Sequence, residues 1–343
     1  MKAPSVDRSI APTSTGITNK MDAIVQDAYG SDARKLLRLA EVVRPAIQDD
    51  QVLVRVAAAS VDRGTVHVMT GMPYAMRLAG FGARAPKAAN PGRCFAGTID
   101  SVGKQVTGFA PGDQVYGTST GTFAEYVAAK PGKVALKPAN LTFGQAAAVP
   151  ISAVTALQAV RRAGVGAADK VLVIGASGGV GSFAVQIAKA FGAEVTGVAS
   201  TSKVEMVRAL GAQHVVDYTA GDFLDGRVRY DLILDTGGNS RLADLRRALT
   251  PTGRLVLVGG ESGARWLGMG RQLKAALLSP LVKQKLGSLM SKENAEDLVV
   301  LTELIESGRV VPAVDKTYPL AEAAAAITYV WEGRARGKVV IAI

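Results

Sequence analysis

The sequence contains few of the residues that bind transition metals. Its 343 residues include one cysteine, Cys94, and two histidines, His67 and His214. A structural zinc site normally takes four cysteine or histidine ligands, so these three residues cannot form one. A catalytic zinc would have to use scattered ligands, and a single cysteine excludes an internal disulfide. We therefore expect a protein that works without a bound metal.

Long apolar runs and a secretory signal are missing too. No uninterrupted apolar run reaches the roughly 20 residues that a transmembrane helix requires. Residues 1–20 are rich in Ser, Thr and Pro and lack the apolar centre of a secretory signal. We expect this stretch to be a disordered lead or a weak targeting segment. We also expect a cytoplasmic location and no transmembrane segment.

Aromatic residues make up only 5% of the chain, whereas 40 basic residues outnumber 29 acidic ones and leave a net charge of +11. The basic residues are spread along the chain and are not interleaved with aromatics, as they are in single-strand nucleic-acid binders. No nucleic-acid partner is therefore expected. We interpret the excess as a scattered basic surface, part of which serves a phosphate-rich cofactor.

The middle of the chain has the pattern of a parallel sheet. Between residues 169 and 260, short β-branched runs alternate with amphipathic helical stretches. The runs lie at residues 170–175, 194–199, 214–218, 230–236 and 254–259. Strands this apolar, separated by helices, predict a parallel sheet covered on both faces. The fold class predicted here is α/β, with a doubly wound Rossmann-type domain.

The flanking segments have other patterns. Residues 21–140 hold short, evenly spaced strands and Gly/Pro turns, which predict a mostly β, barrel-like unit. Toward the C-terminus we expect a helix at about 293–307, a short strand at 310–315, a helix after Pro319 and a last strand at 337–343. Residues 261–292 fit no strand and are typical of helices with an apolar face. They are interpreted as a lid, an oligomer contact or a surface helix.

The sequence GASGGVG at residues 175–181 fits two motifs that exclude each other. Gly175, Ser177 and Gly179 spell the nucleophile elbow of α/β-hydrolases. That motif needs a histidine base after the last strand, and the only histidine downstream is His214, at the start of a predicted strand of the same sheet. Without a base to take its proton, a serine hydroxyl is a poor nucleophile. The hydrolase interpretation is therefore rejected.

The second motif is a glycine-rich turn that receives a dinucleotide pyrophosphate. Gly178 and Gly179 let backbone amides approach the phosphates, and Gly181 lets the helix pack against the strand. The helix beginning near Val180 presents the positive end of its dipole to the phosphates. Ser177 is a hydroxyl donor beside phosphate or ribose. Because the turn follows a strand and heads a βαβ series, we predict a nicotinamide cofactor site here.

The tip of the second strand indicates which nucleotide binds. An NAD-binding unit places Asp or Glu there to hold the ribose 2′-hydroxyl. This chain instead has Ser200, Thr201, Ser202 and Lys203. Hydroxyls and a lysine suit a 2′-phosphate, which an acid would repel, so the predicted cofactor is NADP(H).

These features belong to a longer series of ordered motifs that resembles the medium-chain dehydrogenase/reductase superfamily, in its zinc-independent quinone oxidoreductase branch. The motifs lie at residues 57–71, 91–117, 121–128, 146–160, 175–195, 210–218 and 336–343. The resemblance implies a GroES-like β-rich catalytic domain built from residues 21–144 and 292–343. Between these two segments of the chain, the resemblance implies a central Rossmann NADP-binding domain of residues 145–291, with the active site in the cleft between the two domains. It also implies a homodimer.

The resemblance also shows where zinc ligands are missing. The catalytic-zinc cysteine of zinc-dependent relatives falls near Ala59, and the next ligand falls in Gly92–Arg93–Cys94. Without a Lewis acid, an acceptor that spreads the incoming charge is favoured. We therefore predict hydride transfer from NADPH to a small-molecule quinone or α,β-unsaturated carbonyl, without a metal. The alternatives are a zinc-free alcohol or aldehyde reductase and a non-catalytic NADPH-binding sensor or interaction protein.

Further site residues follow from the resemblance. Thr155 is expected near the nicotinamide ribose, Tyr218 against the 2′-phosphate and Gly259 beside the carboxamide. Arg336 is expected to close over the cofactor. Each also has a purely structural explanation, as a capping hydroxyl, a core-edge aromatic, a turn glycine or a solvated charge.

Two catalytic candidates come from the N-terminal part. Tyr74 falls where related reductases place a tyrosine facing the substrate, and it is the candidate proton donor. Its alternative role is that of a half-buried packing residue. Asp62 is expected to fix the neighbouring loop rather than to transfer protons.

Overall fold

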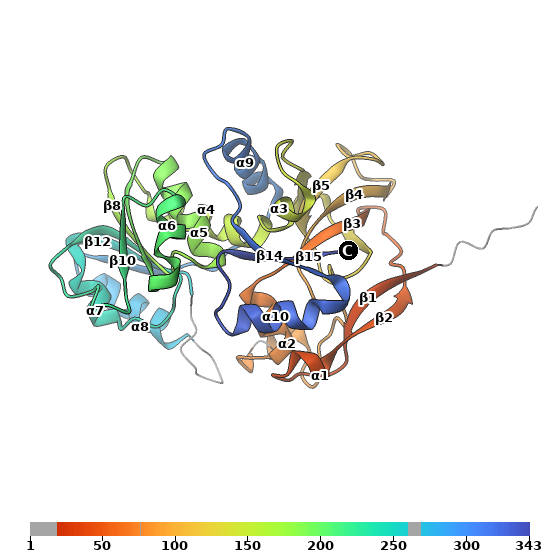
Figure 1. Ribbon diagram of the computed structural model, residues 1–343, viewed down its shortest axis with the longest axis horizontal. Helices are drawn as coiled ribbons and strands as arrows, with labels where there is room; N and C mark the ends of the chain where they lie inside the picture. The colour runs from red at the N-terminus through yellow and green to blue at the C-terminus, as the bar shows by residue number, and fades with distance from the viewer. Residues whose placement is uncertain (1–18, 76, 260–268) are drawn as a thin grey trace, which may run out of the picture.

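The computed structural model describes residues 19–75, 77–259 and 269–343. The predicted N-terminal lead lies outside the described residues except for its last two positions, and the first strand begins at Lys20. Two large sheets organise the molecule and lie side by side in Figure 1. The predicted fold class is confirmed: a parallel Rossmann-type sheet adjoins a β-rich unit built from both ends of the chain.

The Rossmann sheet has six parallel strands in the order β10-β9-β8-β11-β12-β13. Their bounds are β8 (Lys170–Ile174), β9 (Glu194–Ala199), β10 (His214–Asp217), β11 (Tyr230–Asp235), β12 (Leu249–Leu257) and β13 (Lys285–Ser288). Strand order reverses between β8 and β11, so the connections leave these two strands in opposite directions. In open parallel sheets, ligands bind outside the carboxyl ends of the strands at such a switch point.

Helices cover both faces of this sheet because alternate strand residues point in opposite directions. Val171 and Val173 of β8 join one core with α4 and α5, whereas Leu172 and Ile174 join a second core with α7 and α8. The helices that flank the sheet are α4 (Pro150–Ala163), α5 (Gly179–Ala190), α6 (Val204–Ala209), α7 (Leu242–Arg247) and α8 (Gly270–Leu278). Two apolar faces explain why these strands read as continuous hydrophobic runs.

The second sheet has seven strands, ordered β14-β15-β3-β4-β5-β7, with β6 paired to β3. Their bounds are β3 (Val52–Val61), β4 (Cys94–Val102), β5 (Gln114–Thr118), β6 (Tyr126–Ala129), β7 (Val134–Leu136), β14 (Val314–Pro319) and β15 (Lys338–Ala342). β15 pairs antiparallel with β3, which joins the end of the chain to its beginning. A separate ribbon pairs β1 (Lys20–Gln26) with β2 (Leu37–Val43).

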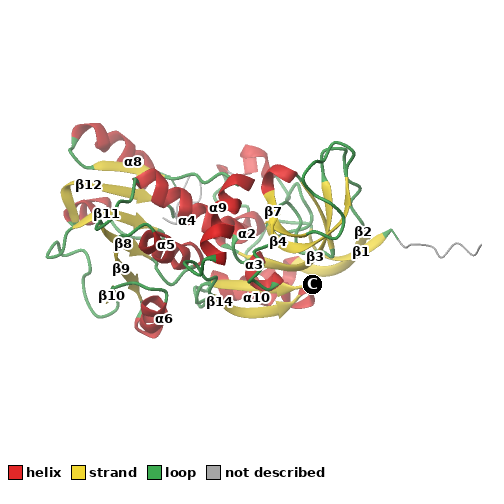
Figure 2. Ribbon diagram, turned by 90° about the horizontal axis from the view of Figure 1, so that it is seen from above, coloured by secondary structure: helices red, strands yellow, loops and turns green. Residues whose placement is uncertain are grey.

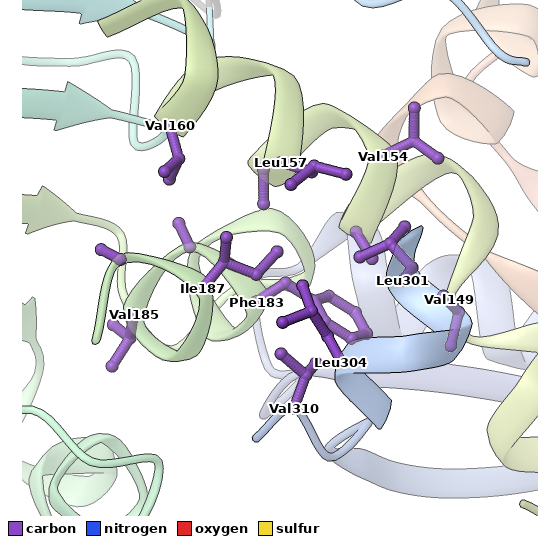
Figure 3. Packing of buried hydrophobic residues seen from close by; sticks show 14 of the residues in the cluster. Val149, Val154, Leu157, Val160, Phe183, Val185, Ile187, Leu301, Leu304 and Val310 are labelled. Atoms are coloured by element: carbon purple, nitrogen blue, oxygen red, sulfur yellow. The ribbon is translucent and has the colours of Figure 1, made fainter. Parts of the chain in front are cut away.

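One hydrophobic core runs continuously from the Rossmann sheet into the β-rich unit. Besides α4 and α5 it contains α9 (Ala295–Glu306), whose Leu301 and Leu304 face Leu157 and Phe183 in Figure 3. Figure 2 shows α4 and α9 in the region between the two sheets. The other α-helices among the described residues are α1 (Ala33–Leu36), α2 (Arg63–Thr70), α3 (Phe143–Ala147) and α10 (Ala323–Trp331). Shared packing of this kind fixes the relative position of the two units.

Two expectations about local structure are wrong. Residues 261–292 do contain a strand, because β13 adds to the edge of the Rossmann sheet beside β12 and buries Leu286. The strand expected at residues 310–315 begins only at Val314, after Pro312, which has no amide to donate to a sheet. Helix α8 and the helix after Pro319, α10, are present as expected.

The domain boundaries at residues 144 and 291 stay a prediction. In the described part of the chain, no helix is long and apolar enough to cross a bilayer.

Candidate cofactor and active site

The glycine-rich turn connects β8 to α5 at the carboxyl edge of the Rossmann sheet. Gly175 has a φ of +78°, in the left-handed region that favours glycine. A Cβ on Gly181 would lie 2.1 Å from the Gly175 carbonyl oxygen, so only glycine lets the helix approach its strand this closely. Gly178 is the N-cap residue and supplies no side chain to the first amides of α5. These amides therefore have the geometry of an anion site.

Ser177 is a buried residue of this turn, with a main-chain link to the other domain. It is 8% exposed, and its carbonyl oxygen accepts a 2.8 Å hydrogen bond from the Gly337 amide, next to Arg336. The hydrolase alternative can be checked here because β8 and β10 run parallel. His214 lies at the amino end of β10 beside Glu194, whereas Ser177 lies beyond the carboxyl end of β8. The histidine is therefore at the opposite edge of the sheet and cannot act as its base.

A cavity of about 530 Å³ lies at the tip of β9, between the Rossmann domain and the last part of the chain. Its lining residues are Ser200, Ser202, Lys203, Tyr218, Asp315, Lys316, Tyr329, Gly333, Arg334 and Arg336. Four predicted cofactor residues therefore meet in one pocket: Ser200, Lys203, Tyr218 and Arg336. Thr201 does not line it, because its hydroxyl bonds to Asp217 and Thr219 on the β10 side.

The pocket carries an excess of positive charge. Lys203, Lys316, Arg334 and Arg336 line it, against the single carboxylate of Asp315. Burial lowers the pKa of Lys203, the Asp315 carboxylate acts in the opposite direction, and Arg336 lowers the pKa further. These side chains come from both domains, so an anion in the pocket would be held from two sides.

Lys203 already connects the two domains. Its Nζ donates to the carbonyl oxygens of Gly333 at 2.9 Å and Ala335 at 2.8 Å. The next residue, Arg336, donates its amide to Asp315 Oδ2 at 2.9 Å. The segment that carries Arg336 is thus fixed beside the tip of β9.

The residues predicted at the nicotinamide end lie at the same carboxyl edge of the sheet. Gly259 follows β12, and a Cβ there would lie 2.6 Å from the Thr236 carbonyl oxygen, so its backbone packs against the loop after β11. Thr155, on α4, is 8% exposed and donates from Oγ1 to Ser291 Oγ at 3.0 Å. Sequence reasoning missed Ser291, because the two hydroxyls are 136 positions apart and neither belongs to a shared motif.

Asp62, which is expected to fix its loop, lies at the start of α2. It is the N-cap residue of α2, and its Oδ1 accepts a 3.0 Å hydrogen bond from the Thr65 amide. It is 8% exposed, and the Cys94 thiol lies 3.8 Å from its Oδ2. This contact caps α2, and the role of Asp62 in fixing the loop stays a prediction.

Tyr74 lies on that loop, where Arg77 organises the chain. The Arg77 guanidinium stands 4.8 Å from the Tyr74 ring centroid and 4.4 Å from that of Tyr29. Its Nε donates to the Gly71 carbonyl oxygen at 2.9 Å. The tyrosine is therefore partly buried against a cation, and its catalytic role stays a prediction.

Known proteins resemble the chain along most of its length. The alcohol dehydrogenase GroES-like domain model matches residues 48–139, and the zinc-binding dehydrogenase model matches residues 210–341. The chain is 34% identical to a 2-methylene-furan-3-one reductase from Solanum lycopersicum, across 96% of its own length and 81% of that protein's. The chain belongs to the medium-chain dehydrogenase/reductase superfamily.

Other members of this superfamily give the same result. An Arabidopsis thaliana protein named NADPH-dependent alkenal/one oxidoreductase, chloroplastic, is 33% identical over 95% of this chain and 80% of its own length. The solved structure of a quinone oxidoreductase from Coxiella burnetii superposes with a TM-score of 0.82 at 28% identity, covering 94% of this chain and 99% of that one. The chain is therefore an oxidoreductase, and its cofactor is a nicotinamide dinucleotide.

The positions of the zinc ligands carry other residues in this medium-chain reductase. Ala59 is fully buried in β3 and offers no ligand atom. Arg93 forms an ion pair with Glu293, which also accepts a 3.1 Å bond from Lys133 Nζ. Among residues 19–75, 77–259 and 269–343, no three His, Cys, Asp or Glu side chains are grouped to hold a metal ion.

Proposed function

We propose that this reductase uses NADPH to reduce a conjugated acceptor, a quinone or an α,β-unsaturated carbonyl, without a metal. The observation that carries the proposal is the basic cavity at the tip of β9. Four cations and one carboxylate line it, and the strand tip has hydroxyls where an NAD-specific unit has an acid. A 2′-phosphate is the part of NADPH that NADH lacks, and it matches this charge.

The predicted residues divide the cofactor among them. The uncapped amides of α5, with the Ser177 hydroxyl beside them, would hold the pyrophosphate. Lys203 and Arg336 would bind the 2′-phosphate, with Tyr218 packed against the adenosine end. Thr155 and the backbone at Gly259 would orient the nicotinamide end. The glycine turn supports this fit, because Cβ atoms are missing where the phosphates would approach.

The acceptor class follows from what the chain can stabilise. The chemistry that bound NADPH would supply is a hydride, which is one proton together with two electrons. Its transfer leaves NADP⁺. On the acceptor, the incoming charge must be delocalised, because Ala59 and Arg93 replace the ligands of a Lewis acid. An enone or quinone spreads this charge over its conjugated system. Tyr74 is our candidate to deliver the proton that completes the reduction.

The substrate names of the relatives agree with this choice. The Arabidopsis protein is named for alkenals and alkenones, and the Coxiella protein for quinones. The proposal is tested by NADPH oxidation with 2-cyclohexenone, a trans-2-alkenal and a benzoquinone, with and without a chelator. Turnover should resist the chelator and be absent with saturated cyclohexanone. Turnover of cyclohexanone at a rate similar to that of cyclohexenone would instead indicate an alcohol or aldehyde reductase.

We also propose a homodimer formed at the free edge of the Rossmann sheet. β13 is the edge strand there, and Leu273, Leu277 and Leu281 expose 62%, 65% and 79% of their surfaces beside it. Exposed leucines next to a strand edge that no other described strand covers are typical of an interface. A Leu277→Glu variant should elute as a monomer in size-exclusion chromatography with light scattering, and a monomeric wild type would refute the dimer. A cytoplasmic location stays a prediction.

A further inference from the structure

A lysine is buried where the two domains meet. Lys338, the first residue of β15, is 2% exposed and ranks among the largest buried side chains of the described residues. Burying an ammonium group is costly unless its donors find partners, so such a residue is tied to a specific arrangement of its surroundings.

The two partners of Lys338 belong to different domains. Its Nζ donates to the Val61 carbonyl oxygen at 3.2 Å and to Ser152 Oγ at 3.1 Å. Val61 ends β3 and precedes Asp62, the cap of the helix that leads to the predicted acceptor side. Ser152 lies one helical turn before Thr155 on α4, on the predicted nicotinamide side. One ammonium group therefore joins the acceptor side to the nicotinamide side.

The stem of the same side chain lies beside the glycine-rich turn. A Cβ built on Gly179 would lie 3.2 Å from Lys338 Cδ and 3.2 Å from Ser152 Oγ. One residue earlier, the Gly337 amide donates to the Ser177 carbonyl oxygen at 2.8 Å. The stem of Lys338 thus occupies the space that a side chain on the first residue of α5 would need, beside the amides at the predicted pyrophosphate site.

A second observation places opposite charges at this junction. The pKa of the Cys94 thiol is raised to about 12, mainly by burial and also by the Asp62 carboxylate, while Lys338 acts in the opposite direction. The carboxylate and the ammonium therefore both act on one thiol that is shielded from water. A buried polar cluster of this kind holds its elements in one geometry, because any shift leaves a charged group without its partners.

We propose that Lys338 is a positioning residue, which keeps the acceptor side and the nicotinamide side in register for hydride transfer. This role rests on the proposed cofactor site and reduction. It differs from simple core packing in one respect. Loss of the ammonium misaligns the reacting groups, and misalignment slows the chemical step rather than only lowering stability.

The test compares Lys338→Met with Lys170→Met, which alters an exposed lysine at the amino end of β8, away from the site. For each variant, kcat and KM are measured with 2-cyclohexenone, together with the isotope effect from NADPH deuterated at the transferred position. For Lys338→Met we expect kcat to fall roughly 10- to 100-fold. Its isotope effect should rise, because hydride transfer becomes rate-limiting. Lys170→Met should stay within about twofold of wild type.

A second variant keeps the proposal testable if Lys338→Met fails to fold. Ser152→Ala removes only one hydrogen-bond partner and should lower kcat a few-fold, with a raised isotope effect. If the folded variants keep the wild-type kcat and isotope effect and lose only thermal stability, Lys338 fills space and the proposal is wrong.

The binding of NADP⁺ separates this proposal from the proposed function. Lys338→Met and Ser152→Ala should each bind NADP⁺ more weakly than wild type does. A fluorescence titration measures this binding and needs no acceptor. If wild type reduces no conjugated acceptor, the proposed function fails, and the titration still decides whether Lys338 supports nucleotide binding at the glycine-rich turn. Unchanged NADP⁺ affinity in that case overturns the role of Lys338.

Discussion

Replacing Lys203 with methionine should weaken the binding of NADPH far more than the binding of NADH. The substitution keeps the length of the side chain and removes one of the four cations that line the β9 cavity. A hydrogen bond to a charged group contributes about 1.5–3 kcal/mol, which corresponds to roughly a 10- to 100-fold change in the Michaelis constant for NADPH. The other three cations keep the loss from being larger.

The comparison with NADH isolates the phosphate contribution. Lys203 also donates to the carbonyl oxygens of Gly333 and Ala335, and this link serves both nucleotides. If the variant loosens the contact between the two domains, the Michaelis constants for NADPH and for NADH rise by the same factor. The ratio of the two constants therefore reports the phosphate contribution alone. The assay is steady-state oxidation of NADPH and of NADH with one enone, for wild type, Lys203→Met and Lys170→Met. Equal changes for both nucleotides in Lys203→Met would refute the assignment of the cavity.

Four further predictions follow from the site. The preference for NADPH over NADH should fall with rising pH below 10.5, the ordinary lysine pKa, because burial lowers the pKa of Lys203 and its cationic form is lost earlier; a ratio of kcat/KM values that is flat up to that pH would contradict this. Gly181→Ala places a methyl group 2.1 Å from the Gly175 carbonyl oxygen, so the free energy of unfolding should fall by about 1–3 kcal/mol, as measured by denaturant titration. The same variant should bind NADP⁺ more weakly in a fluorescence titration. The Cys94 thiol, with its pKa raised to about 12, should resist iodoacetamide at neutral pH until the chain is denatured, and mass spectrometry of the native protein would reveal any labelling. Tyr74→Phe should lower kcat for enones roughly 100-fold if the phenol delivers the proton, and undiminished turnover removes it from the mechanism.

The regular part of the fold is predictable because its strands are buried on both sides. The apolar runs at 170–175 and 230–236 become β8 and β11, the two strands at the switch point, since short apolar runs rich in β-branched residues suit a sheet covered on both faces. β13 escapes prediction because Lys285–Ser288 has one buried apolar residue, Leu286. It is a strand because β12 offers it an edge, which is a property of the tertiary structure.

The candidate site also contains residues that local motifs predict and residues that only the tertiary structure brings together. The glycine turn and the tip of β9 are local motifs, so Ser200 and Lys203 could be named from spacing, whereas Tyr218 and Arg336 needed the family resemblance. The cavity residues Lys316 and Arg334 were not predicted, because they come from a distant part of the chain.

Lys338 could not be named from spacing either, because it reads as the polar first residue of a last strand. Its partners Val61 and Ser152 lie 277 and 186 positions away. Contacts of that range depend on how β15 enters the sheet, and one sequence carries no pattern that reports it.

The pairing of β15 with β3 has a consequence for biosynthesis. The strands of the Rossmann sheet occupy one continuous stretch of chain and can assemble as soon as they leave the ribosome. The β-rich sheet must wait for residues 338–342, which are translated after all its other described strands, while its first strands stand exposed. Nascent chains halted shortly before that strand should therefore hold a formed nucleotide-binding half beside an unfinished partner that chaperones recognise.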